Sequence, residues 1–236
     1  MVLFLVFRPG SGGGSGDESG SAAATSSKTS SSSSTSSSPK PTSTKPTLPD
    51  YTTTGRYQRM QTGTGVRGTE GDLFTYRVEV EEGTGVDVNT FGKAVDRALG
   101  HKRSWTSQGE FRFQRVTDEE PRLTVRLATP ETVDEACAEA GLDTEGFLSC
   151  HSGDAVYLNL NRWAVGTKEI RNLDVYRPYL VNHEVGHILG FTHESCTGKG
   201  DPAPLMQQQT KGLDGCKANA WRYTADGSEI TGPPAD

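Results

Sequence analysis

Three of the five histidines of the chain, His183, His187 and His193, lie within one stretch of eleven residues, and Glu184 stands beside the first of them. Residues four apart lie on one face of a helix, so the imidazoles of His183 and His187 can bind the same metal ion. Glu184 is rotated from that face by about 100°, which places its carboxylate beside the metal, where it can take a proton from a metal-activated water. Gly190 permits a left-handed turn that brings His193 back as a third ligand. Three nitrogen ligands with a fourth position open to water predict a catalytic zinc site.

The same stretch, residues 183–193, reads H-E-x-x-H-x-x-G-x-x-H and resembles the signature of the metzincin zinc endopeptidases. In that family a turn containing methionine lies beneath the metal, and Met206, which follows Pro202 and Pro204, stands at the matching place. The resemblance implies that Met206 forms the hydrophobic floor of the site without binding the metal. The alternative is an ordinary core methionine.

Neither of two metzincin subfamilies accounts for the whole pattern. The short interval between His193 and Met206 is similar to that of the matrixins, whereas the G-F-x-H-E of residues 190–194 is similar to that of the astacins. Astacins place a tyrosine two residues beyond the methionine, and Gln208 stands there, so the resemblance implies no tyrosine ligand.

The longer string of residues 204–210, together with Gly215 and Cys216, closely resembles an uncharacterised domain family common in actinobacteria. The resemblance covers about residues 55–225. That family is typically found behind an N-terminal anchor, which implies an outward-facing, membrane-attached domain. It implies no particular substrate.

These residues support a zinc-dependent peptidase, in which Glu184 deprotonates the water and later protonates the leaving amine. The metzincin resemblance implies a protein or peptide substrate, and an amide of the cell envelope would need the same groups. The alternative is a non-catalytic, zinc-stabilised module that binds a cell-envelope partner. Glu184 favours the enzyme, because metal binding alone does not require a carboxylate there. An N-terminally anchored adhesion or scaffold module is compatible with either hypothesis, and we expect a monomer.

The four cysteines form two locally spaced pairs without a C-x-x-C motif. This spacing favours two disulfides, Cys137–Cys150 and Cys196–Cys216, although four cysteines allow three connectivities. Disulfides indicate an oxidising, extracytoplasmic compartment. Cys196 lies close enough to His193 to be considered as a thiolate ligand, but a closed four-ligand site would leave Glu184 without a water to activate.

Composition divides the chain at about residue 54. Residues 1–7 are apolar but too short to span a bilayer, and we interpret them either as the remnant of a membrane anchor or signal segment or as an apolar start without a role. Residues 8–54 are rich in Ser, Thr, Gly and Pro, with 15 Ser between positions 11 and 47, which predicts a disordered linker. Residues 55–236 hold enough apolar side chains for one domain. Their 20 basic against 27 acidic side chains argue against nucleic-acid binding and leave the N-terminal segment as the only membrane contact.

The folded region is predicted to have an α+β, metzincin-like fold, with a twisted mixed sheet of four to five strands flanked by helices. Periodicity and turn residues predict strands at 73–81, 111–116, 123–127 and 155–163, and helices from 87 or 89 to 99, from 130 to 140 and from 174–178 to 189. The strands at 111–116 and 123–127 are expected to pair antiparallel, at least in part. The strand at 155–163 either pairs with an extended substrate at the edge of the cleft or lies inside the sheet.

Other polar residues are weaker candidates for a role in the site. His101 and His151 are expected on the surface rather than at the metal. Four tyrosines are candidate donors to a developing oxyanion, with half-buried packing as the alternative for each: Tyr157, Tyr176, Tyr179 and Tyr223.

Overall fold

The computed structural model of the protein describes residues 47–235. The expected anchor remnant at 1–7 and most of the expected linker at 8–54 therefore lie outside the described residues. The folded region begins before residue 55, because the Thr52 amide donates to Gly83 O (3.0 Å) and the Thr54 amide donates to the Glu81 carboxylate (2.7 Å). Within residues 47–235, none of the helices has the length and the apolar character needed to cross a bilayer.

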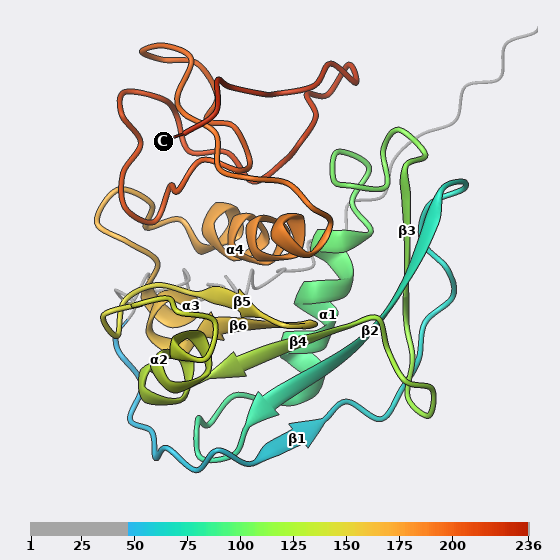
Figure 1. Ribbon diagram of the computed structural model, residues 1–236, viewed down its shortest axis with the longest axis vertical. Coiled ribbons are helices and arrows are strands. Elements are labelled where there is room, and N and C mark those ends of the chain that lie inside the picture. Colours follow the sequence, from blue (N-terminus) through green and yellow to red (C-terminus); the bar gives the residue numbers. More distant parts are fainter. Residues whose placement is uncertain (1–46, 236) are drawn as a thin grey trace, which may run out of the picture. The chain divides into compact units, whose positions relative to one another are not determined.

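A mixed, six-stranded sheet forms the centre of the described fold (Figure 1). Its strands follow the order β1-β2-β4-β6-β5, and β3 also pairs with β2. The β2/β3, β2/β4 and β4/β6 pairs are parallel, whereas β1/β2 and β5/β6 are antiparallel. The α+β class and the mixed sheet flanked by helices are confirmed, whereas the predicted count of four to five strands is wrong, because the short strands β1 and β5 add to the four predicted ones. The strands are β1 Tyr57–Arg59, β2 Asp72–Glu81, β3 Phe111–Arg115, β4 Leu123–Ala128, β5 Cys150–Ser152 and β6 Ala155–Asn159.

The expected antiparallel pairing of 111–116 with 123–127 is wrong. Both strands run parallel to β2, with β3 beside Asp72–Tyr76 and β4 beside Tyr76–Val80. The Val116 amide donates to Tyr76 O, and the Arg122 amide donates to Thr75 O. Carbonyls of successive strand residues point to opposite edges of the strand. The connection between β3 and β4 therefore carries the chain from one edge of β2 to the other, and it does not form a hairpin.

The predicted strand at 155–163 is too long. It ends at Asn159, whose side-chain oxygen accepts hydrogen bonds from the Asn161 and Arg162 amides and caps the short helix α3, Leu160–Val165. β6 also lies between β4 and β5. It is therefore an internal strand, and β5 is the strand at that end of the sheet.

Helices α1 (Val88–Leu99) and α4 (Leu173–Ile188) pack together on one face of the sheet, where most of the hydrophobic core lies (Figure 1). The Asp87 side chain begins α1 by accepting from the Thr90 amide (2.8 Å). Helix α2 (Pro130–Ala138) packs on the opposite face of the sheet against Ala128 and Tyr157. The predicted positions of these three helices are confirmed to within a few residues.

Both predicted disulfides are present, and residues 47–235 contain no free cysteine. Cys137–Cys150 joins α2 to β5. Cys196–Cys216 closes part of the long segment after α4, which contains only isolated bridges instead of strands (Figure 1). This segment carries Met206, so its conformation depends on the disulfide and on side-chain hydrogen bonds.

Candidate metal and catalytic site

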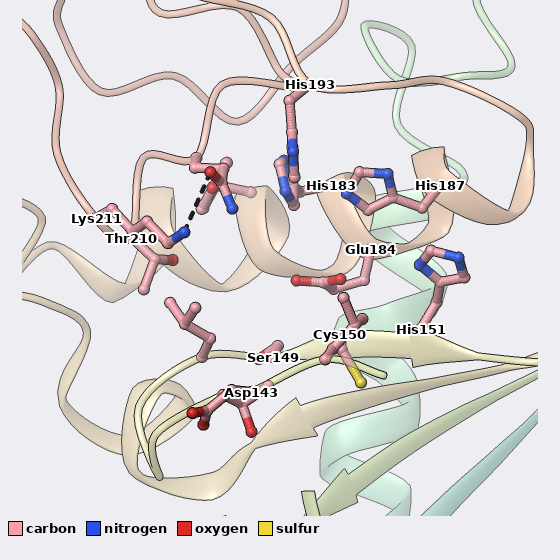
Figure 2. A pocket seen from close by; sticks show the side chains of 15 residues that line it. Asp143, Ser149, Cys150, His151, His183, Glu184, His187, His193, Thr210 and Lys211 are labelled. Carbon is pink, nitrogen blue, oxygen red and sulfur yellow. Dashed lines mark hydrogen bonds between the residues drawn. The ribbon is translucent and has the colours of Figure 1, made fainter. Parts of the chain in front are cut away.

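The three predicted ligands converge at the C-terminal end of α4 (Figure 2). His183 and His187 lie one turn apart on the helix, and the chain then reverses at Gly190, whose φ is 95°. The Phe191 amide donates to Gly186 O (3.0 Å) in this turn, after which His193 approaches the helix. Candidate ligand atoms of the three histidines all lie within 4.8 Å of one another, so the group can hold a metal ion.

Backbone carbonyls orient two of the imidazoles. His183 Nδ1 lies 2.9 Å from Leu205 O, and His187 Nδ1 lies 3.0 Å from Phe191 O. A carbonyl oxygen only accepts hydrogen bonds, so each Nδ1 carries the proton and each Nε2 keeps a free lone pair. Metal-binding histidines commonly have this support from their second ring nitrogen.

Burial also favours the neutral form of these imidazoles. Burial and the neighbouring histidines lower the pKa of His183 to about 3 and that of His187 to about 4. Burial, followed by the positive charge of Lys211, lowers the pKa of His193. Metals bind the neutral imidazole, so no proton has to leave these side chains at neutral pH before a metal binds.

Glu184 lies beside the histidines and is almost fully buried, with 5% of its surface exposed. Its carboxyl group makes no hydrogen bond or ion pair with another residue in the 47–235 region. Burial alone raises its pKa to about 8. A carboxyl group with this environment, next to a group that can hold a metal, is suited to proton transfer near neutral pH.

A pocket of about 220 Å³ opens beside the histidines and Glu184 (Figure 2). One wall comes from β5 and the loop before it, and the other comes from α4 and the segment at 208–211. The remaining lining residues are Leu142, Asp143, Thr144, Leu148, Ser149, Cys150, His151, Tyr179, Gln208, Thr210 and Lys211.

Met206 is fully buried beneath α4, in a turn where the Gln207 amide donates to Pro204 O (3.0 Å). Its sulfur lies so close to the helix that a Cβ built on Gly186 would be 2.5 Å from it. The preceding residue, Leu205, supplies the carbonyl that His183 contacts. The turn thus contributes both a hydrophobic side chain and a hydrogen-bond acceptor beneath the histidines.

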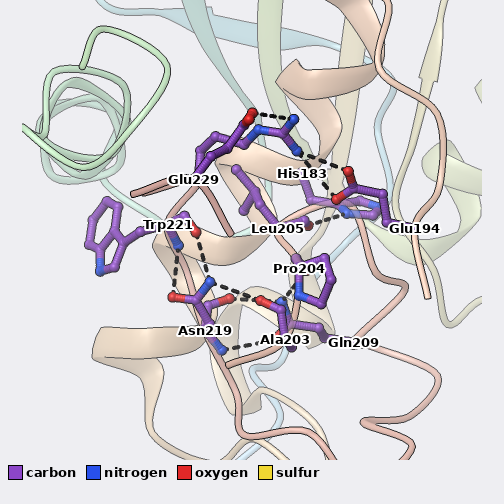
Figure 3. Close-up of polar contacts among 10 residues, drawn as sticks. His183, Glu194, Ala203, Pro204, Leu205, Gln209, Asn219, Trp221 and Glu229 are labelled. Carbon is purple, nitrogen blue, oxygen red and sulfur yellow. Dashed lines mark hydrogen bonds and ion pairs between the residues drawn. The ribbon is translucent and has the colours of Figure 1, made fainter. Parts of the chain in front are cut away.

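Buried side-chain amides hold this turn in place (Figure 3). The Gln209 side chain donates to Pro204 O (3.2 Å), and the Asn219 side chain donates to Ala203 O (2.9 Å). Gln209 and Asn219 are also joined directly, because the Gln209 side-chain oxygen accepts from the backbone N–H of Asn219 (3.0 Å). Sequence patterns carried no signal for these roles, since single polar residues in an irregular segment have no periodicity.

Glu194, directly after His193, is held by the buried Arg222. The two side chains approach to 3.1 Å, and Arg222 also pairs with Glu229 at 2.5 Å (Figure 3). This ion-pair cluster fixes the chain just beyond the third histidine. It was not predicted, because Glu194 lies 28 residues before Arg222 in an irregular part of the chain.

Most of the candidate tyrosines make hydrogen bonds within the protein or lie away from the pocket. The Tyr176 hydroxyl pairs with Thr210 (2.9 Å), and the Tyr179 hydroxyl donates to Gln207 O (3.0 Å). Tyr157 pairs with Arg126 (2.5 Å), and Tyr223 is buried. Only Tyr179 lines the pocket. The packing alternative therefore holds for these side chains.

The two remaining histidines have different surroundings. His101 stacks on Trp221, with 3.8 Å between ring centroids, and does not line the pocket. His151 is half-buried and lines the pocket instead of the open surface, and it lies outside the group of three that can hold a metal. Cys150 could have predicted this position of His151. The disulfide places the Cys150 side chain on the α2 face of the sheet, and because side chains alternate along a strand, His151 lies on the α4 face.

The fold and site define an α+β domain with a histidine triad and a buried glutamate beside a pocket. Residues 46–228 match a family described as proteins of unknown function, DUF3152, and the chain belongs to that family. A search of curated proteins finds no match.

Proposed function

We propose that the protein is a zinc-dependent peptidase that hydrolyses peptide or other amide bonds. The observation that supports this most directly is the arrangement of three neutral imidazoles beside a buried glutamate in one pocket. His183, His187 and His193 would hold the metal, and Glu184 would act as general base. Met206 would form the floor of the site.

The donor set suits zinc. Zn²⁺ commonly takes three histidine nitrogens in catalytic sites, and candidate ligand atoms of His183, His187 and His193 lie within 4.8 Å of one another. The Nδ1 hydrogen bonds to Leu205 O and Phe191 O hold these rings without using the ligand atoms. When bound, zinc supplies a Lewis acid that polarises a carbonyl group and lowers the pKa of water.

Glu184 supplies the proton transfers. It accepts a proton only as a carboxylate, and a nearby dication favours that form over the neutral one that burial favours. After taking a proton from water, the same side chain can return it to the leaving amine. Its position in the pocket wall, beside the histidines, allows both transfers without a second carboxyl group.

The substrate would bind along β5. This strand pairs with β6 on one side only and contributes Cys150 and His151 to the pocket. An extended peptide can add to such an edge by main-chain hydrogen bonds. The two disulfides are typical of an oxidising, extracytoplasmic location, where the substrate would be a secreted or cell-envelope protein or peptide. Attachment through the N-terminal segment belongs to the same proposal.

The test combines metal content with hydrolysis. The full chain, produced under oxidising conditions, is expected to bind one zinc and to cleave members of a mixed peptide library in a chelator-sensitive way. Glu184→Gln should keep zinc and lose cleavage, whereas the exposed Glu135→Gln on α2 serves as the matched control and should keep both. Zinc without cleavage in the wild type would favour a zinc-stabilised binding module. A wild-type protein without zinc would refute the metal site.

A further inference from the structure

His151 is directed into the site by the geometry of β5. Cys150 pairs in register with Tyr157, and His151 pairs with Val156. Side chains of successive strand residues point to opposite faces. Cys150 is bound to Cys137 of α2 on one face, so His151 points to the other face, toward α4.

The His151 ring lies beside the metal-binding group without belonging to it. Its centroid is 5.2 Å from that of His187, with only 24° between the ring planes (Figure 2). Within the described part of the chain, neither ring nitrogen of His151 has a hydrogen-bond partner. A half-buried imidazole with two free nitrogens, facing a pocket, is available to a ligand.

Such a donor would assist amide hydrolysis in addition to the metal, because negative charge develops on the carbonyl oxygen in the transition state. Three other polar side chains that line the pocket already have partners. The Tyr179 hydroxyl already donates to Gln207 O, and the Thr210 hydroxyl pairs with Tyr176. Lys211 donates to Gln208 on the side of the pocket away from His187 (Figure 2).

We propose that a ring N–H of His151 donates a hydrogen bond to the carbonyl oxygen of the scissile amide, and that the bond strengthens as this oxygen becomes negative. An imidazole carries at least one N–H in either protonation state. The inference rests on the proposed peptidase function and assigns that reaction a second catalytic residue, on β5 instead of α4.

The test uses His151→Phe, which keeps a planar ring next to His187 but removes both nitrogens. The matched control is His101→Phe, which makes the same change against Trp221, outside the pocket. For each full-length protein we would measure zinc content, kcat and KM on a cleaved library peptide, and the binding of N-phosphoryl-Leu-Ala by calorimetry. The phosphoryl group is tetrahedral and anionic like the transition state, and the leucine suits the Leu142 and Leu148 wall.

His151→Phe is expected to keep one zinc and a KM within about threefold of wild type, while kcat falls about 100- to 1,000-fold. Affinity for N-phosphoryl-Leu-Ala should fall by a similar factor, and His101→Phe should match wild type. An unchanged kcat and phosphoryl affinity would overturn the proposal, and so would loss of zinc, which would make His151 a ligand.

Failure of the peptidase proposal is distinguishable from failure of this one. If the wild type binds zinc but cleaves no peptide, the calorimetry alone decides. A lower affinity in His151→Phe then supports the donor, and an equal affinity overturns it. A zinc-loaded wild type that does not bind the compound also overturns it.

Discussion

Replacing Gly186 by alanine tests whether the site helix and the methionine turn are packed as tightly as the structure indicates. Gly186 lies between His183 and His187 on α4. A Cβ there would lie 2.5 Å from Met206 Sδ and 2.7 Å from Trp105 Cζ2, both closer than real Cβ contacts. Trp105 resists movement, because it is buried and its indole N–H donates to Asn182 O (3.0 Å). Met206 can yield only by moving in a fully buried place.

The magnitude follows from two opposing terms. Overpacking a buried site costs about 1 to 3 kcal/mol, and alanine gains about 1 kcal/mol over glycine within a helix. Two contacts below 3 Å with one immobile partner place the cost in the upper part of that range. We therefore expect Gly186→Ala to lower the free energy of unfolding by roughly 1 to 2 kcal/mol. We also expect weaker zinc binding, because movement of Met206 displaces the Leu205 carbonyl from His183.

The assay is urea unfolding of the chelated protein, followed by zinc titration against a competing chelator. Gly65→Ala is the matched control, since its Cβ would have no neighbour within 4 Å and its φ is not positive. That variant should lie within about 0.5 kcal/mol of wild type. If Gly186→Ala were as stable as wild type and bound zinc equally well, Met206 would not support the helix at this point.

Three further predictions concern charge and crosslinks. Burial raises the pKa of Glu184 to about 8 from 4.5, so the chelated wild type should lose stability as pH rises between these values. Glu184→Gln lacks this loss, and its advantage in the free energy of unfolding should grow by at most about 1.4 kcal/mol per pH unit. A constant difference would contradict the assignment. Burial lowers the pKa of His183 to about 3 from its usual 6.5, so the folded state binds fewer protons than the unfolded state between these values. The chelated Glu184→Gln variant should therefore lose stability as pH falls from 6.5 toward 4. A free energy of unfolding that does not change with pH in this range would exclude a buried neutral His183. Replacing Cys196 and Cys216 by serine should lower the free energy of unfolding by about 3 kcal/mol and weaken zinc binding. The same change at Cys137 and Cys150 should leave zinc affinity intact. Equal losses of zinc affinity in the two variants would argue against a specific role for Cys196–Cys216.

Sequence reasoning located the candidate metal site because its geometry is local. His183 and His187 are placed by one helical turn, and His193 by a single positive-φ residue, so residue spacing carries nearly all of the information. Cys137–Cys150 and Cys196–Cys216 were likewise predictable from close spacing in the chain. The residues that form the metal site or one disulfide are never more than about twenty residues apart in the sequence.

The sheet was less predictable because strand alternation does not encode partners. The apolar pattern of β3 (Phe111–Arg115) and β4 (Leu123–Ala128) fits two arrangements equally well. The two strands could pair with each other, or they could lie on opposite edges of β2. At Asn159 two local patterns indicated different structures. The alternation of apolar and polar residues predicted that the strand continues, whereas the Asn side chain is suited to cap a helix. The cap prevailed and ended β6. The edge of the pocket is formed by β5, because β5 pairs along the side of β6 that faces away from β4.

The orientation of the ligands depends on parts of the chain that spacing cannot reveal. His183 is aimed by Leu205 O, which is itself held by the turn that Gln209 and Asn219 support. His151 is aimed by β5, whose face is set by a disulfide to α2. The ligand types are thus set by eleven consecutive residues, but the direction of His183 comes from an irregular segment, and the direction of the neighbouring His151 comes from an edge strand. Substitutions in the irregular segment should therefore alter metal affinity, and substitutions in β5 should alter turnover, without changing a single ligand.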